Sequence, residues 1–305
     1  MHISVFQFDP RPQGAAENEK VFASAQQVLG VEVSLPALAS RCTVGNLDHH
    51  GPDSTDQTPS ACEQALGFGI PYDWSCDQDG GPRPSEWPLP VLVTVRPDAD
   101  SVTAMAVIEN RLSSRPIDLD LVQAVGLFDR LGPSAGKPEV RVSAITRKSM
   151  DFQLTLAERV SWVADLLAGV NKSAEIATLV ASHDVELTTA RQASELSLHA
   201  DGRIACVVST HRFATTLGYE NAPVVVACNP SMPVDFKDVS KGTFKKFTVC
   251  RYDSHVKCDL PAALLELQKF EPGWGGRGDI FGSPQGVSSA LTLQQVLEVV
   301  IRHLG

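Results

Sequence analysis

The stretch VLVTVRPDADS, Val91–Ser101, places a nearly continuous run of aliphatic, mostly β-branched residues directly before two aspartates. Such a run is typical of a strand buried on both faces of a parallel sheet. Ser101 can cap a helix over VTAMAVIENRL, residues 102–112. A buried strand that passes directly into a helix predicts an α/β fold with a mostly parallel sheet and flanking helices.

The same alternation of strand and helix precedes and follows this stretch. The predicted strands are HISVFQF (2–8), which ends at Asp9-Pro10, and CTVGNL (42–47). The predicted helices are ENEKVFASAQQVL (17–29) and PSACEQALG (59–67), the second begun by Thr58 and Pro59. LVQAVGLFDRLG (121–132) adds an apolar segment around Asp129. Residues 1–150 are therefore expected to form one α/β domain.

The pattern changes after residue 150. Residues 151–197 are dominated by helical spacing and predict a helical connector. Three strand-like runs, RIACVVST, APVVVAC and FKKFTVCRY, then precede two helical segments, PAALLELQKF and LTLQQVLEVVIRHL. Residues 198–305 are expected to form a second, smaller α/β domain.

Composition limits the classes of function. The 305-residue chain has a formal net charge of -10, which disfavours tracking of long nucleic acid by bulk electrostatics. It has no apolar run of membrane-spanning length, and MHISVFQFDP lacks the order of a signal peptide, so a cytoplasmic location is expected. The seven cysteines include no CxxC pair and are expected to be reduced and mostly buried.

Acidic and histidine side chains follow several of the predicted strands. GNLDHHG, Gly45–Gly51, carries Asp48, His49 and His50, and RPDADS carries Asp98 and Asp100. Ligands in an open α/β sheet bind beyond the carboxyl ends of the strands, where such residues can converge. With Asp9 and Asp129 they make a set of imidazoles and carboxylates that suits Mn²⁺ or Mg²⁺ in a two-metal hydrolytic site.

Several of these residues also have plain structural interpretations. Asp98 and Asp100 can cap the helix near Ser101, and Asp9 and Asp129 suit a strand end and a helix end. Asp118 and Asp120 are expected to be caps. The long segment 70–90 carries Trp74 and Trp87, which can stack on a base or anchor the interior.

Three motifs together resemble the DHH phosphoesterase superfamily. NLDHHG followed by TPSACEQAL looks like its signature motif and following helix, and TVRPDADSVTAM resembles its H-x-x-P-D-x-D motif. YENAPVVVACN, KFTVCRYDSHVKCDLPAALLELQKF and GWGGRGDIFGSPQG are similar to the DHH-associated substrate-binding domain with its GGGH loop. The resemblance covers most of the chain.

The chain departs from the family in two respects. The D-x-D motif follows the DHH motif here instead of preceding it, which indicates a circular permutation in which Asp9 takes the place of the motif II aspartate and Asp129 that of motif IV. Thr94 stands where the first motif has histidine, and Arg277 stands where the glycine loop has histidine. Because threonine is a poor ligand for Mn²⁺, Thr94 also allows a weaker centre, a single-metal centre or none.

The resemblance implies a metal-dependent phosphoesterase that binds two Mn²⁺ or Mg²⁺ ions through Asp9, Asp48, His49, Asp98, Asp100 and Asp129. His50 and Arg277 would act on the phosphate during catalysis. The remaining substrate-binding residues would be Arg96, Gly275, Gly276 and Ser283. Expected substrates are a short single-stranded oligonucleotide, a nucleoside bisphosphate or a linearised cyclic dinucleotide.

Two alternatives to this activity stay open at this point. One is an inactive member of the fold that binds a nucleotide or a protein, and the other is a pyrophosphatase or polyphosphatase. No membrane partner is expected, and the oligomeric state is open between a monomer and a homodimer.

Overall fold

The computed structural model describes residues 3–9, 14–25, 27–50, 57–71, 74, 90–234, 238–252, 256–276 and 278–305. The chain divides into two compact units, Met1–Ala181 and Ser182–Gly305. The division falls inside the long helix α8 (Ser173–Gln192). Residues 151–181, which we expected in a separate connector, belong to the first unit.

The first unit contains a four-stranded parallel sheet with the order β1-β4-β2-β3. Its strands are β1 (Ser4–Gln7), β2 (Val28–Val31), β3 (Gly45–Leu47) and β4 (Val91–Thr94). Together with the helices around it, this sheet confirms the predicted α/β class. Because all four strands run in one direction, their carboxyl ends lie at one edge of the sheet.

One strand of this first sheet was not expected from the sequence. Helix α1 (Ala15–Ser24) ends before Ala25, and β2 begins at Val28 inside the segment predicted to be helical through residue 29. All four residues of β2 are buried. Strand β2 lies between β4 and β3, so Glu32 directly after it stands at the middle of the sheet edge.

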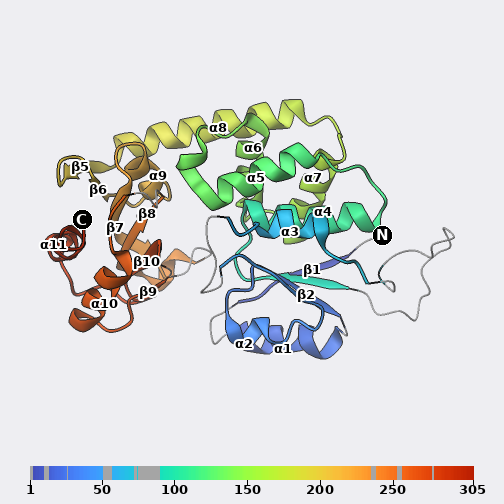
Figure 1. The fold of residues 1–305 in the computed structure, drawn as a ribbon, viewed down its shortest axis with the longest axis horizontal. Coiled ribbons are helices and arrows are strands. Elements are labelled where there is room, and N and C mark those ends of the chain that lie inside the picture. Colours follow the sequence, from blue (N-terminus) through green and yellow to red (C-terminus); the bar gives the residue numbers. More distant parts are fainter. Residues whose placement is uncertain are drawn as a thin grey trace. The chain divides into compact units, whose positions relative to one another are not determined.

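Helices cover both faces of this sheet (Figure 1). Helix α1 and α2 (Pro36–Ala39) lie on one face, where Val28 and Val93 join their apolar core. Leu29 and Leu92 point to the other face and join a larger core. The helices of that face are α3 (Ala61–Gly67), α4 (Ala99–Leu112), α5 (Leu119–Leu131), α6 (Val140–Ser149) and α7 (Leu156–Leu167). A 3-10 turn, Gly132–Ala135, follows α5.

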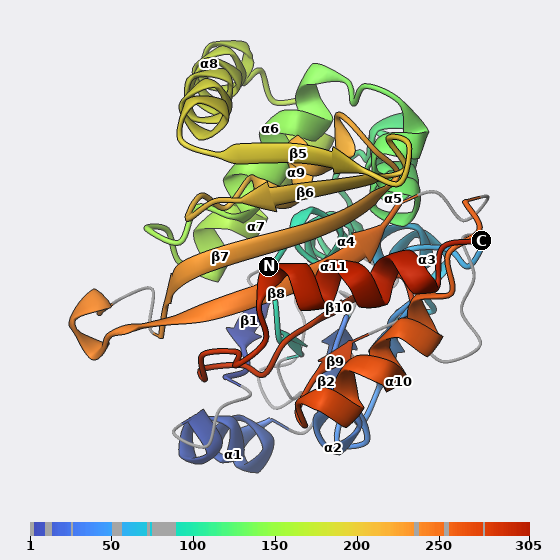
Figure 2. The same ribbon diagram turned by 90° about the vertical axis from the view of Figure 1, so that its left-hand side faces the viewer.

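The second unit is built on a six-stranded mixed sheet with the order β5-β6-β7-β8-β10-β9 (Figure 2). Its strands are β5 (Glu195–His199), β6 (Ile204–Val208), β7 (Val224–Pro233), β8 (Thr243–Arg251), β9 (Gly275–Gly276) and β10 (Ile280–Gly282). Among the described strands of this second sheet, only β6 and β7 pair in parallel.

Two helices pack on one face of this second sheet. They are α10 (Leu260–Phe270) and α11 (Leu293–Arg302), and their apolar residues share a core with β6, β7 and β8. Helix α9 (Ala214–Tyr219) contributes to a smaller core with β6 and β7, and a 3-10 turn spans Val239–Lys241. The three strands and two helices expected here from the sequence are all present.

The described cysteines agree with the predicted reduced, buried state. Cys42, Cys62, Cys206, Cys228, Cys250 and Cys258 are free and buried, and Cys76 lies outside the described residues. Within the described part of the chain, no helix combines the length and the apolar character needed to cross a membrane.

Candidate metal centre

Four ionisable side chains meet at the carboxyl edge of the parallel sheet. They are Glu32 after β2, His49 after β3, Asp100 in the first turn of α4 and Asp129 in α5. One ligand atom from each lies within 4.8 Å of the others, and the group could hold a metal ion. Of the residues expected to converge here, His49, Asp100 and Asp129 do so, although Asp129 is carried by a helix.

His49 lies within 4 Å of each of the other three residues. Its Nε2 atom lies 2.9 Å from Asp129 Oδ2, 3.2 Å from Glu32 Oε1 and 3.9 Å from Asp100 Oδ2. The side chain is only 8% exposed. Imidazole nitrogen and carboxylate oxygen are both ligands of divalent metal ions, so atoms gathered this closely could bind one.

Glu32 is the member of the group that the sequence did not predict. It is buried, its Oε1 lies 3.2 Å from His49 Nε2, and its carboxyl group shares a hydrogen bond with that of Asp98. Burial raises the carboxyl pKa well above its ordinary value, and the charges of Asp98, Asp100 and Asp129 raise it further. A buried carboxylate among other acids is costly without a cation, so these residues fit a bound metal ion.

Asp100 is fixed by the start of helix α3. Its oxygens accept hydrogen bonds from Ser60 Oγ at 2.9 Å, the Ala61 amide at 2.7 Å and the Cys62 amide at 2.9 Å. Burial, followed by the charge of Asp129, nevertheless raises the pKa of Asp100 to about 6. The three donors orient the carboxylate while leaving Oδ2 facing His49.

The N-cap of α3 differs from the prediction. Ser60, not Thr58, caps the helix, and Glu63 completes the capping box by accepting from the Ser60 amide at 2.8 Å. Arg130 in turn holds Glu63 through an ion pair of 3.0 Å. Helix α3 is thereby tied both to Asp100 and to the part of α5 that carries Asp129.

Asp98 acts as a helix cap in the structure. It is the N-cap of α4, and its Oδ1 accepts from the amide and the hydroxyl of Ser101 at 3.0 and 2.8 Å. Ser101, expected as the cap, is the third helical residue and completes the capping box. Burial and the charge of Asp129 raise the pKa of Asp98. It lies beside the metal-binding group without belonging to it.

Asp48 and His50 form a pair next to the centre. His50 Nδ1 lies 2.8 Å from Asp48 Oδ1, and the same oxygen accepts from the His50 amide at 2.9 Å. Burial opposes ionisation of Asp48, but the hydrogen bonds from His50 outweigh it and lower its carboxyl pKa. His50 also forms a second possible ligand group with Glu32 and His49.

The expected convergence of Asp9 with Asp48 is wrong. Strand β1 pairs with β4, but β1 and β3 form opposite edges of the four-stranded sheet. The amide and carbonyl of Asp9 bond the side chain of Asn18 at 3.2 and 2.8 Å. Asp9 belongs to neither ligand group among the described residues.

The residues predicted to bind substrate are spread over both units. Arg96 is exposed, two residues beyond the end of β4. Gly275 and Gly276 form β9 and pair with Gly282 and Phe281 of β10. Ser283 is buried, and its hydroxyl accepts from the Phe247 amide at 2.9 Å. Arg277 lies outside the described residues.

Two further positions bear on the expected site. Trp74 is fully buried in the larger core and bonds Gln27 through its indole nitrogen, so it is an interior anchor and does not stack on a base. Trp87 lies outside the described residues. Thr94 at the end of β4 is fully buried, and its hydroxyl has no hydrogen-bond partner among the described residues.

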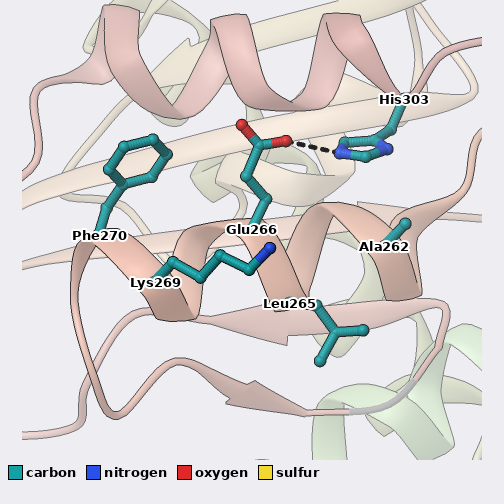
Figure 3. A pocket seen from close by; sticks show the side chains of 6 residues that line it. All are labelled: Ala262, Leu265, Glu266, Lys269, Phe270 and His303. Carbon is teal, nitrogen blue, oxygen red and sulfur yellow. Dashed lines mark hydrogen bonds and ion pairs between the residues drawn. The ribbon is translucent and has the colours of Figure 1, made fainter.

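The second unit has a hollow of about 510 Å³ over α10 and the end of α11 (Figure 3). Ala262, Leu265, Glu266, Lys269, Phe270 and His303 line it. His303 is paired with Glu266 at 2.7 Å. The hollow contains none of the residues of the metal-binding group.

Comparison with protein-family models and with curated proteins finds no match to this chain.

Proposed function

We propose that the protein is a metal-dependent phosphoesterase that hydrolyses a small nucleotide. The meeting of Glu32, His49, Asp100 and Asp129 at the carboxyl edge of the sheet is the observation that carries the proposal. The DHH-like and D-x-D-like stretches supply two of these four residues, His49 and Asp100. The class of reaction follows from the resemblance of those stretches to the DHH superfamily.

The donor set favours Mn²⁺ or Mg²⁺. It combines carboxylate oxygens with imidazole nitrogen and contains no thiolate, and this mixture suits hard or borderline divalent ions. Cys62 is nearby, but burial raises its thiol pKa well above the ordinary value and its sulfur bonds the Val122 carbonyl at 3.4 Å. The two possible ligand groups, which share Glu32 and His49, name the residues that would hold the proposed ions.

The ions and the residues around them would have separate roles in catalysis. When bound, the ions would supply Lewis-acid activation of a water molecule and of a phosphoryl oxygen. Asp48 holds His50 at Nδ1, which leaves Nε2 of His50 available to bind a phosphate oxygen or to exchange a proton with it. The α3 amides hold Asp100 in place, so the site is preorganised before substrate arrives.

The net charge of -10 favours a small substrate over a duplex, because a long polyanion needs a basic surface for binding. Short oligonucleotides, nucleoside bisphosphates and linearised cyclic dinucleotides remain the proposed substrates. An inactive nucleotide- or protein-binding scaffold is the alternative that Thr94 favours, since a buried threonine replaces a histidine ligand of the family motif. Glu32 argues against an inactive scaffold, because its carboxylate adds a possible metal ligand that the motif comparison did not include.

The test is hydrolysis by the purified protein after removal of metal and addition of Mn²⁺. A dinucleotide, a nucleoside bisphosphate and pyrophosphate would be compared, with release of mononucleotide or phosphate as the readout. We expect Mn²⁺-dependent turnover of a nucleotide and a loss of at least about 100-fold in Asp129→Asn. Turnover of pyrophosphate alone would support the pyrophosphatase alternative, and Mn²⁺ binding with no turnover of any substrate would support the scaffold.

A further inference from the structure

Glu32 reaches the metal centre from an unusual backbone conformation. Its φ angle is 53°, in the left-handed region that residues other than glycine seldom occupy. Such a conformation persists only where the surrounding structure holds it, and it is concentrated at functional sites. Because the backbone angle sets the direction of the side chain, what holds this turn also holds the Glu32 carboxylate beside His49.

The main chain on both sides of Glu32 is fixed by β3. The Glu32 amide donates to the Leu47 carbonyl at 2.8 Å, and the Ser34 amide closes a tight turn on the Glu32 carbonyl at 3.0 Å. Val33 lies inside that turn, and the side chain of Asn46 forms hydrogen bonds with both its amide and its carbonyl. Asn46 accepts from the Val33 amide at 3.2 Å and donates to the Val33 carbonyl at 3.2 Å.

The same Asn46 amide also reaches the neighbouring ligand loop. Its Nδ2 donates to Asp48 Oδ2 at 3.4 Å. Asn46 therefore connects the turn that carries Glu32 with the loop that carries Asp48, His49 and His50.

Gly30 makes room for this arrangement. It stands opposite Asn46 in the pairing of β2 with β3. A Cβ atom at Gly30 would lie 2.4 Å from Asn46 Oδ1 and 3.0 Å from its Cγ. Any larger residue would push the amide away from Val33, so the close approach needs glycine at this position.

We propose that Asn46 is a positioning residue of the metal centre. Its side-chain amide holds the Val33 peptide groups, so that Glu32 keeps the left-handed conformation in which its carboxylate faces His49. The inference rests on the proposed metal-binding role of Glu32. It deepens that proposal by assigning to Asn46, which touches no metal, control over how well the centre binds one.

The test compares Asn46→Ala with Asn110→Ala, and uses Mn²⁺ alone as the probe. Asn110 is a matched control because it is also a buried asparagine of the first unit that bonds a backbone carbonyl, at 2.8 Å from Ala164 O. It stands on α4 about 15 Å along the helix from Asp100, by the helical rise per residue. Mn²⁺ affinity is measured by calorimetry, and melting temperature is measured separately in a chelator.

We expect both variants to melt at a lower temperature, but only Asn46→Ala to bind Mn²⁺ roughly 10- to 100-fold more weakly, the usual effect of losing a group that orients a ligand. Gly30→Ala, which keeps Asn46 but displaces its amide, should also weaken Mn²⁺ binding, and it replaces Asn46→Ala in the comparison if that variant does not fold. If the Asn46 or Gly30 variant binds Mn²⁺ as tightly as the wild-type protein, or if Asn110→Ala loses as much Mn²⁺ affinity, the positioning role of Asn46 is overturned. The proposed metal centre would stand in either case. Failure of the wild-type protein to bind Mn²⁺ overturns the metal centre, and this inference with it.

Discussion

His49 Nε2 lies 2.9 Å from an oxygen of Asp129. This contact joins the loop after β3 to helix α5, two segments that are far apart in the sequence. His49, like Glu32, belongs to both possible ligand groups. The centre is therefore expected to depend on His49 more than on any residue that serves only one group.

His49→Ala should reduce Mn²⁺ affinity by about 100-fold or more, since removing a ligand should exceed the roughly 10- to 100-fold effect of removing a group that only orients one. Calorimetric titration of metal-free protein with Mn²⁺ measures the change. His303→Ala is the control, because His303 is paired with Glu266 in the second unit and should leave the affinity unchanged. Equal affinities in the two variants would exclude His49 as a ligand.

The sequence predicted the parts of this centre that follow strongly patterned strands. Strand β4 is a continuous aliphatic run and β3 ends directly at Asp48, so the places of Asp100 and His49 at the sheet edge could be expected. Asp129 was recognised at the end of an apolar segment. Its position depends on how α5 packs, which local pattern does not determine.

Glu32 was missed because the helical spacing of residues 17–29 was followed too far. The residues VLGVEV, Val28–Val33, are rich in β-branched residues and run to Pro36, which was the available signal for a strand. Asp9 was placed wrongly for another reason. Strand order is a property of tertiary structure, and the insertion of β4 and β2 between β1 and β3 leaves no trace in the pattern of any single strand.

The metal-free protein should become more stable as the pH falls from 7 to 5. Burial and Asp129 raise the pKa of Asp100 to about 6, above its ordinary value of 3.8. The folded state then binds more protons than the unfolded state between these two values, so the free energy of unfolding falls as the pH rises through them. Asp100 alone should change it by about 1 kcal/mol between pH 5 and 7.

Urea unfolding in a chelator at both pH values measures this effect. Added Mn²⁺ should reverse the trend at pH 7, because it stabilises the ionised carboxylates of the folded state. A metal-free protein that is equally stable at both values, or more stable at pH 7, would contradict the shift of Asp100.

The buried cysteines should not react in the folded protein. Burial raises the pKa of Cys42 to about 11, and burial together with Cys228 raises that of Cys206 to about 11. Because the thiolate is the reactive form, iodoacetamide at pH 7.5 should modify neither residue until denaturant is added. Peptide mass spectrometry before and after unfolding locates the modified residues, and labelling of Cys206 in the native protein would contradict its burial.

The ion pair between Arg130 and Glu63 should stabilise the protein measurably. The two side chains are 14% and 19% exposed, and Glu63 also holds the Ser60 amide. Arg130→Met should lower the free energy of unfolding by about 1–3 kcal/mol, because Glu63 is left partly buried without its partner. Arg191→Met breaks an exposed pair with Glu220 and should cost less than about 1 kcal/mol. Equal losses in urea unfolding would show that the Arg130 pair has no special role.

Gly126 lets α3 and α5 approach closely enough to build the centre. A Cβ atom at this position would lie 2.6 Å from Ser60 Oγ and 2.7 Å from Glu63 Cδ, whereas one at Gly67 would meet nothing within 4 Å. Alanine favours a helix over glycine by about 1 kcal/mol, so Gly67→Ala should be neutral or slightly stabilising. Gly126→Ala should instead lower the free energy of unfolding by about 1–3 kcal/mol through overpacking.

Because the displaced Ser60 hydroxyl also bonds Asp100, Gly126→Ala should weaken Mn²⁺ binding while Gly67→Ala should not. Urea unfolding and Mn²⁺ titration of the two variants test both effects, and wild-type Mn²⁺ affinity in Gly126→Ala would show that Asp100 does not need the α3 N-terminus to remain in place.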